Sequence, residues 1–330
     1  MNSNDEVMVS IVCVTYNHQD YIKQAIEGFV MQKTNFKYEV IIHDDASKDD
    51  TAQIVREYQK NFPNIIHPIL QECNQYSKGK KIHHIIAPNV RGKYIAICEG
   101  DDFWIDDRKL QKQVDFLENH PEYSGCVHNS ILQNLLEKKL TLFNDGLKGI
   151  CDHDVDIYDV LDNWGKEFHT SSIMLRASIY RDYFINEKPL FSQNLFSVGD
   201  FPLAIYMCFH GKIRYFCNVM SVYRFNTPGS WSERYRNDPK KTKIDESIIN
   251  MLKEADEYSS HKYHEAFDKN ISYREFLLLE STHNYKKMTD KKYSQYVENR
   301  GMRYKRMLWI KRCCPLLPEI ARFLKRILSD

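Results

Sequence analysis

Three short apolar segments alternate with helical patterns, and this alternation constrains the fold more than any other feature. The segments span residues 7–14, 38–42 and 94–98 and are rich in β-branched residues, which predicts buried strands. Residues 22–30 carry apolar side chains at i, i+3 and i+4 spacing, which predicts an amphipathic helix, and a second helix is predicted to begin near Thr51. Alternation of this kind predicts an α/β fold with a parallel sheet covered by helices.

Carboxylates gather at the ends of two of these predicted strands. They are Asp44 and Asp45 after the second segment, and Glu99, Asp101 and Asp102 after the third. Ligands of parallel sheets bind beyond the carboxyl ends of the strands. Carboxylate oxygens suit Mg²⁺ or Mn²⁺, which commonly bind together with substrate phosphates. A single Asp-Asp pair would be an ordinary solvated turn, but two clusters at one sheet edge favour a site.

Some neighbouring polar residues are better explained as helix caps. Ser47, Asp49 and Asp50 can each cap the helix that follows, and we assign Asp49 and Asp50 mainly to that role. The two earlier aspartates come too soon to cap it and are therefore the stronger site candidates. Asn17 or Asp20 could cap the helix predicted over residues 22–30.

Three motifs, taken in order, resemble glycosyltransferase family 2, a group of inverting enzymes with the GT-A fold. They are VSIVCVTYN at residues 9–17, DDASKDDT at residues 44–51, and the segment at residues 92–102 that begins GKYI and ends EGDD. The clear match covers roughly residues 7–130, and weaker matches extend to about residue 232. The resemblance implies a Rossmann-like nucleotide-sugar-binding domain, with a mostly parallel sheet flanked by helices.

The same resemblance implies a nucleotide-sugar donor, usually a uridine diphosphate sugar, with a divalent metal, Mn²⁺ or Mg²⁺, on its diphosphate. The residues implied to bind the donor are Thr15, Tyr16, Asn17, Asp44, Asp45, Glu99 and Asp102. Asp45 would face the base, with Asp44 supporting it. Asp101 would be the principal metal ligand.

Two positions depart from the family pattern. The segment Ile82–His84 stands where the family often has Ala-Arg-Asn, and Asn226 stands where many relatives place a histidine near the metal. An amide oxygen is a weaker ligand than imidazole for Mn²⁺ but is tolerable for Mg²⁺. Asn226 is therefore a further candidate ligand, and we expect modest metal affinity.

The catalytic base is expected in a later acidic segment. Inverting transfer needs a general base to deprotonate the acceptor hydroxyl. The segment around Gly199 and Asp200 resembles the family segment that supplies it, which makes Asp200 the predicted catalytic residue. Pro202 suits a first helical turn and places Asp200 at or near the N-cap, so a capping role alone is the alternative.

Weaker candidates have ordinary explanations as well. Residues 168–172 resemble the family segment under the acceptor site, but they could equally be a core strand with satisfied hydroxyls. Trp104 and Trp231 could stack on sugar rings or simply pack in the protein.

Charge and cysteine usage argue against a nucleic-acid-binding protein and against a framework of disulfide bonds. The net charge of +1 gives no overall field that would attract nucleic acid. Nine cysteines without a Cys-x-x-Cys pair favour reduced thiols in a cytosolic protein. No segment resembles a signal peptide or reaches the length of a spanning helix, so we expect a cytoplasmic location.

The C-terminal part differs from the rest. We predict a GT-A catalytic domain over residues 1–235 and a helical extension over residues 236–330. Basic residues mixed with Trp, Leu and Ile over 302–312, and a short amphipathic helix over 320–328, suit an anionic membrane surface. The protein would then be peripheral on the inner face of the cell membrane. The alternative is a helix packed on the catalytic domain or on a second copy in a homo-oligomer.

These features together predict a metal-dependent inverting glycosyltransferase. It would move a sugar from a nucleotide sugar to a glycan or lipid-linked acceptor in the synthesis of a bacterial surface polysaccharide. One alternative is a nucleotide-sugar-binding protein without turnover. A nucleotidyltransferase is less favoured, because it would usually need a Gly-rich basic loop where Thr15–His18 stands.

Overall fold

The computed structural model describes residues 6–162, 167–193, 199–230, 233 and 241–313. The chain divides into two compact units, with the division near residue 237. The first unit is an α/β structure built on one mixed sheet, and the second unit is helical. The predicted α/β class and the helical C-terminal part are therefore both present.

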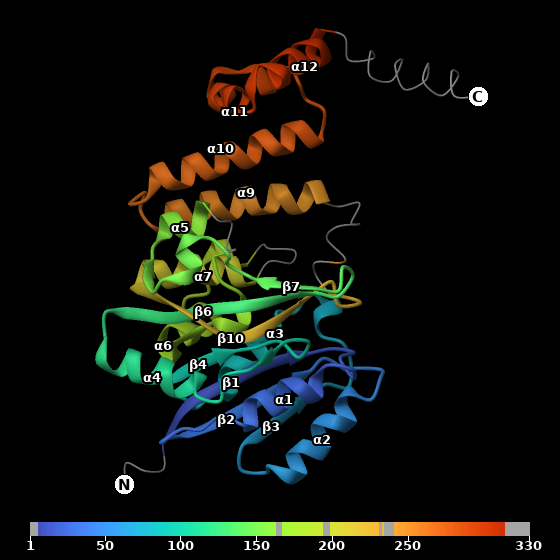
Figure 1. Cartoon of the computed structure of the whole chain (residues 1–330), viewed down its shortest axis with the longest axis vertical. Helices are drawn as coiled ribbons and strands as arrows, with labels where there is room; N and C mark the ends of the chain where they lie inside the picture. Colours follow the sequence, from blue (N-terminus) through green and yellow to red (C-terminus); the bar gives the residue numbers. More distant parts are fainter. Residues whose placement is uncertain (1–5, 163–166, 194–198, 231–232, 234–240, 314–330) are drawn as a thin grey trace, which may run out of the picture. The chain divides into compact units, whose positions relative to one another are not determined.

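The first half of the sheet is parallel, as the alternation predicted. It consists of β1 (Val7–Thr15), β2 (Lys37–Asp44), β3 (Ile66–Leu70) and β4 (Tyr94–Ile97), in the order β3-β2-β1-β4. The strand β1 pairs in parallel with both β2 and β4. The carboxyl ends of these strands consequently lie at one edge of the sheet (Figure 1).

Strands that the sequence did not predict extend the sheet. They are β5 (Phe103–Trp104), β6 (Tyr123–Asn134), β7 (Lys139–Leu142), β8 (His153–Val155), β9 (Met174–Arg176) and β10 (Lys212–Phe225). The short β9 lies antiparallel between β4 and β6, and β10 runs parallel to β6. The strand β5 follows β4 in the chain and pairs antiparallel with β10 near its carboxyl end, where Phe103 lies opposite Val222. Residues far apart in sequence thus meet beside the end of β4.

Helices cover this sheet. They are α1 (Ile22–Val30), α2 (Thr51–Asn61), α3 (Ile82–Ile86), α4 (Lys109–Asn119), α5 (Ile157–Asp162), α6 (Ala177–Arg181) and α7 (Asp200–His210). Apolar residues of α1, α2 and α4 form one core with β1, β2 and β4. The helix predicted over residues 22–30 is present with those bounds. Cys13 and Cys98 are buried free thiols in this unit, as their apolar surroundings predicted.

Trp104 belongs to this core. Its side chain is buried, its ring packs edge-on against Phe29 with centroids 5.0 Å apart, and its Nε1–H donates to the Ser171 carbonyl at 2.9 Å. The helix α1 approaches β5 so closely that a Cβ on Gly28 would lie 2.9 Å from the Trp104 carbonyl oxygen. The idea that Trp104 stacks on a sugar ring is therefore wrong, because both of its faces are enclosed. Trp231 lies outside the described residues.

The C-terminal unit is formed by α9 (Lys241–Tyr258), α10 (His264–Ser281), α11 (Ser294–Asn299) and α12 (Gly301–Cys313). A small apolar cluster holds its last part together, with members Phe276, Met288, Tyr293, Val297 and Leu308. Arg300 donates to the Glu280 carboxylate at 2.6 Å and joins α10 to the start of α12. Within the described chain, no helix is both long and apolar enough to cross a membrane. The amphipathic helix predicted over 320–328 lies outside the described residues.

Candidate active site

The loops that follow β1 and β2 are joined by hydrogen bonds. Asn17 adopts a left-handed conformation, with φ of 54°, and its Oδ1 accepts from the Lys48 backbone N–H at 2.8 Å. Asp49 accepts from the Thr51 N–H and from the Gln19 N–H, so it satisfies the first turn of α2 and the opposite loop together. Thr15 is buried and Tyr16 is partly exposed at the same edge of the sheet.

Three capping expectations were wrong. Tyr21 precedes α1, and no side chain bonds to that helix's first amides, so neither Asn17 nor Asp20 caps it. Asp50 holds the N-cap position of α2 but makes no capping hydrogen bond. The reason for the first result is that Asn17 is already used to fix the loop after β2, and its left-handed backbone ends the strand instead.

The two aspartates after β2 are both engaged with backbone amides. Asp44 accepts from the Ser47 N–H and from the Ser47 hydroxyl, which closes its own turn. Asp45 is buried, and its two oxygens accept from the backbone N–H groups of Gln75 at 2.7 Å and Tyr76 at 3.0 Å. Each oxygen keeps a second lone pair, so a role toward a base stays a prediction. Through these two hydrogen bonds, Asp45 positions the loop at residues 75–76.

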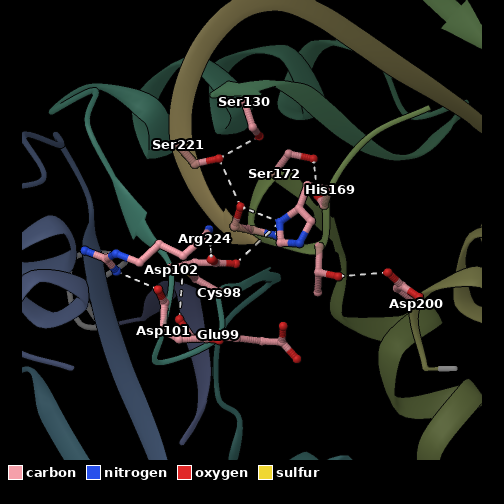
Figure 2. Close-up of polar contacts among 12 residues, drawn as sticks. Cys98, Glu99, Asp101, Asp102, Ser130, His169, Ser172, Asp200, Ser221 and Arg224 are labelled. Atoms are coloured by element: carbon pink, nitrogen blue, oxygen red, sulfur yellow. Dashed lines mark hydrogen bonds and ion pairs between the residues drawn. The ribbon is translucent and has the colours of Figure 1, made fainter. Parts of the chain in front are cut away.

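The acidic residues after β4 form a cluster, which Figure 2 shows in detail. The Thr227 hydroxyl donates to Oδ2 of Asp101 at 2.7 Å, and the Arg224 N–H donates to Oδ1 of Asp102 at 2.8 Å. Oδ2 of Asp102 is buried and has no hydrogen-bond partner. Glu99 keeps an exposed side chain, so the cluster can be reached from solvent.

Gly100 makes this close assembly of strand ends possible. A Cβ on this residue would lie 2.6 Å from Oγ1 of Thr15, which is far below a normal contact. Any larger residue would push the end of β1 away from the acidic cluster. The close contact with Thr15 therefore requires glycine between Glu99 and Asp101.

The electrostatic surroundings disfavour a full set of negative charges. Burial raises the pKa of Asp102 well above its usual range, and the charges of Asp101 and Glu99 add to this. Glu99 keeps exposed surface, but its carboxylate is partly desolvated, which raises its pKa, and the charges of Asp101 and Asp200 add to this. Arg224 is the cation at the centre of the cluster, where its guanidinium donates to the Asp101 carbonyl at 2.5 Å. An added divalent cation would relieve the remaining repulsion.

His169 faces the unpartnered oxygen of Asp102. Nδ1 of His169 accepts from the Ser171 N–H at 3.3 Å and lies 3.5 Å from Oδ2 of Asp102. Its ring stacks on Tyr223 with centroids 3.8 Å apart, and burial lowers its pKa to about 3, which keeps the imidazole neutral. The same nitrogen lies 2.9 Å from the Ser171 hydroxyl oxygen, and His169 and Asp102 are candidate metal ligands.

The candidate metal ligands in the structure therefore differ from those expected. Ligand atoms of Glu99, Asp102 and His169 lie within 4.8 Å of one another, and Asp101 is not a member of this described group. The amide of Asn226 donates to Oδ1 of Asn134 at 3.2 Å. Residues 168–172 do not predict a ligand role for His169, because nothing in them shows that β9 places them against the end of β4. Metal roles for Asp101 and Asn226 stay predictions.

Asp200 is the first residue of α7, directly after the N-cap residue Gly199. Its Oδ2 accepts from the Thr170 hydroxyl at 3.0 Å, and its Oδ1 accepts from the Phe201 N–H at 2.8 Å. Thr170 is adjacent to His169, so the predicted base and the acidic cluster are linked through two consecutive residues. The pKa of Glu99, which is raised first by desolvation, is raised further by the charge of Asp200, so the two carboxylates lie within electrostatic range of each other.

The departure at Ile82–His84 is explained by packing. His83 stacks on Phe184 with ring centroids 5.0 Å apart, and its Nδ1 lies 2.8 Å from the Tyr180 hydroxyl. Burial lowers the pKa of His83 to about 4. His83 is a half-buried, neutral residue of α3 that packs against Tyr180 of α6.

Known proteins resemble this chain in sequence and in fold. The sequence profile of the family described as "Glycosyl transferase family 2" matches residues 10–189. An uncharacterized protein of Mycobacterium tuberculosis is 32% identical over 231 residues, which are 69% of this chain and 61% of the relative. The chain thus spans about three fifths of the length of this relative.

A second relative and a solved structure extend the comparison. A protein of Escherichia coli named UDP-Glc:alpha-D-GlcNAc-diphosphoundecaprenol beta-1,3-glucosyltransferase is 33% identical over 112 residues, 34% of this chain and 41% of the relative. The structure of S. aureus TarS residues 1–349 in complex with UDP-GlcNAc has a TM-score of 0.59 at 15% identity and covers 88% of this chain and 80% of that one. The structural likeness shows the fold, and the profile match over more than half of the chain shows that it belongs to glycosyltransferase family 2.

Proposed function

We propose that this chain is a metal-dependent inverting glycosyltransferase that uses a nucleotide-sugar donor, with uridine diphosphate as the carrier. The observation that carries the proposal is the solvent-reachable acidic cluster at the end of β4, with the predicted base Asp200 facing it. Family membership and the name of the Escherichia coli relative support the activity. The TarS complex supports uridine diphosphate, since it holds UDP-GlcNAc in the same fold.

The residues present fit a divalent metal. The buried oxygen of Asp102 lacks a donor, and the neutral nitrogen of His169 faces it at 3.5 Å. Glu99 supplies an exposed carboxylate beside them, and Asp101 is the alternative ligand that the family resemblance implies. Bound Mn²⁺ or Mg²⁺ would offset the negative charge of the donor diphosphate as it leaves.

Asp200 is proposed to act on the acceptor. The acceptor hydroxyl oxygen forms a bond to the anomeric carbon, the bond from that carbon to the diphosphate oxygen breaks, and Asp200 takes the hydroxyl proton. The hydrogen bond from Thr170 fixes the orientation of the carboxylate. Because attack comes from the side opposite the diphosphate, the anomeric configuration is inverted.

The acceptor is proposed to be a glycan or a lipid-linked glycan of a surface polysaccharide. The name of the Escherichia coli relative includes a diphosphoundecaprenol-linked sugar, which supports the lipid-linked form. A peripheral membrane position would fit such an acceptor. The helix α12 exposes Met302, Trp309 and Ile310 together with basic residues, although these are distributed around the helix and do not form one apolar face. Binding of the full chain to anionic liposomes tests this part, and absence of binding removes it.

The test of the activity begins with the donor. Thermal stabilisation of the full chain by nucleotide sugars, with and without Mn²⁺, should identify a donor whose effect depends on the metal. Hydrolysis or transfer of that donor is then measured. Stabilisation without any turnover, even with a panel of glycan and lipid-linked acceptors, would favour a binding protein. Release of pyrophosphate from a nucleoside triphosphate and a sugar phosphate would favour a nucleotidyltransferase. If no nucleotide sugar stabilises the protein, the proposal fails.

A further inference from the structure

The turn between α9 and α10 gathers one carboxylate and two imidazoles. Asp256 lies in the last two turns of α9, His261 lies in the turn, and His264 begins α10. Nδ1 of His261 lies 2.9 Å from Oδ2 of Asp256, and Nδ1 of His264 lies 2.7 Å from the same oxygen. The three ligand atoms form a compact group outside the predicted catalytic unit.

Asp256 is unusual for a carboxylate on the surface of a helical pair. It is more than nine-tenths buried, and its second oxygen, Oδ1, is buried without a hydrogen-bond partner. A buried carboxylate oxygen that lacks a partner costs free energy, so such groups are usually paired or bound to a metal. Both histidine contacts are made to Oδ2, so Oδ1 still lacks a hydrogen-bond partner.

The backbone of the turn is held in an uncommon conformation that brings His261 onto Asp256. Ser260 and His261 are consecutive residues with φ of 53° and 61°. The His261 N–H donates to the Asp256 carbonyl at 3.0 Å, which closes the turn. Left-handed backbone at two consecutive residues other than glycine is costly and usually has a structural reason. In this turn, the left-handed conformation brings His261 into contact with Asp256, which lies five residues earlier in the chain.

We propose that Asp256, His261 and His264 form a Zn²⁺ site that links α9 to α10. Two imidazole nitrogens and one carboxylate oxygen suit Zn²⁺ and disfavour Mg²⁺ or Ca²⁺, which prefer oxygen ligands. Three protein ligands leave the fourth position of a tetrahedral ion to water.

The geometry needs only a small adjustment. Ligand atoms at normal zinc distances in a tetrahedral site are about 3.3 Å apart, somewhat more than the present nitrogen-to-oxygen distances. The side chains of His261 and His264 are 61% and 64% exposed, so the rings can withdraw without disturbing the core. Binding of zinc would replace the protons that now lie between the rings and Asp256.

The test uses the full chain freed of metal with a chelator. Calorimetric titration with Zn²⁺ compares wild type with His261→Asn/His264→Asn, and with His283→Asn as a matched control, because His283 is an exposed histidine of the same unit that bonds to Tyr285. All three proteins keep Glu99, Asp102 and His169, so a difference between them reports the α9–α10 site alone. Co²⁺ gives a second readout, since tetrahedral coordination by imidazole produces strong visible absorption.

Wild type and His283→Asn should bind one more zinc ion than the double variant, and wild type should unfold at a higher temperature with Zn²⁺ than without it. Loss of one ligand, in His264→Asn or Asp256→Asn, should weaken binding at this site by at least about 100-fold. Circular dichroism checks that each variant is folded. Equal zinc stoichiometry in wild type and a folded double variant would overturn the proposal, and the cluster would then be a hydrogen-bonded clamp. Lack of any zinc binding by wild type would overturn it as well.

Discussion

Nδ1 of His169 and Oδ2 of Asp102 lie 3.5 Å apart, and the same nitrogen accepts a hydrogen bond from the Ser171 N–H. His169 comes from the segment before β9, and Asp102 follows β4, so the pair exists only because β9 is antiparallel to β4. The same arrangement puts Thr170 within reach of Asp200. One short strand therefore determines the position of the predicted metal ligands relative to the predicted base.

Asp102→Asn should stabilise the metal-free protein and abolish its response to metal. The raised pKa of Asp102 means that the folded protein loses stability as the pH rises from the unfolded value of about 3.9 toward the folded value. An amide removes that loss and can donate to Nδ1 of His169. Unfolding at neutral pH, measured with and without Mn²⁺, checks both effects. A variant that responds to Mn²⁺ like wild type would contradict the assignment.

His169→Ala and Asp101→Ala distinguish the two ligand sets. If His169 binds the metal, its removal should lower metal affinity by at least about 10-fold while UDP binding without metal is kept. Ser130→Ala is the matched control, because Ser130 is the distal member of the same hydroxyl chain through Ser221 and Ser171. If Asp101→Ala loses metal-dependent donor binding and His169→Ala does not, the ligand implied by family resemblance is the right one.

Asp45→Ala should affect both the fold and the donor. The substitution frees the N–H groups of Gln75 and Tyr76, and loss of such partners typically costs about 1–3 kcal/mol. If Asp45 also accepts a hydrogen bond from the ring N–H of uracil, UDP affinity should fall roughly 5- to 150-fold. Denaturant unfolding and UDP titration separate the two effects. Reduced stability with unchanged UDP affinity would show that Asp45 only holds the loop.

Asp200→Asn should lower sugar transfer by roughly 10²–10⁴-fold, the usual contribution of a general base. Asparagine keeps one oxygen that can accept from the Phe201 N–H, and its NH₂ group can donate to the Thr170 hydroxyl oxygen, so the start of α7 should be preserved. Donor affinity should change little, because the predicted donor and metal ligands remain. Thr170→Ser is the matched control, since it retains the hydroxyl and should retain most activity. Near-normal transfer by Asp200→Asn would place the base elsewhere.

The parallel half of the fold could be predicted from local sequence, and the second half could not. The apolar runs at β1, β2 and β4 and the spacing in α1 are complete signals within a few residues each. In contrast, β9 has three residues and β5 has two, which is too short for a periodic pattern. Their places depend on pairing with distant strands, as Phe103 of β5 does with Val222 of β10.

The candidate site shows the same division. Glu99, Asp101 and Asp102 could be identified because they follow a recognisable strand. His169 could not be identified as a ligand, because its contact with Asp102 depends on the unpredicted β9. Asn17 was expected to cap α1, but its side chain bonds across to Lys48 in the next loop, and such a contact leaves no trace in local sequence.

Lys109 should make the stability of the protein depend on pH in the alkaline range. It is fully buried in α4, its Nζ donates to Oε1 of Gln113 at 2.7 Å, and it lies 4.0 Å from the Trp104 ring centroid. Burial lowers its pKa to about 7, whereas the unfolded chain has the ordinary value of about 10.4. Between these values the unfolded state binds more protons, so this residue makes stability rise with pH.

Lys109→Met should remove that rise while it fills a similar volume. The penalty of the buried charge is fully present below pH 7 and disappears toward pH 10. A shift of this size corresponds to about 5 kcal/mol at most. Loss of the hydrogen bond from Lys109 to Gln113 costs about 1–3 kcal/mol and opposes the stability gained by removing the buried charge. The change of the unfolding free energy with pH is therefore the decisive quantity. Urea unfolding at pH 7 and pH 9.5 measures it, with Lys112→Met as the control, because Lys112 lies on the same helix but is exposed and paired with Asp106. If Lys109→Met and wild type show the same change between the two pH values, Lys109 titrates near its ordinary pKa despite its burial.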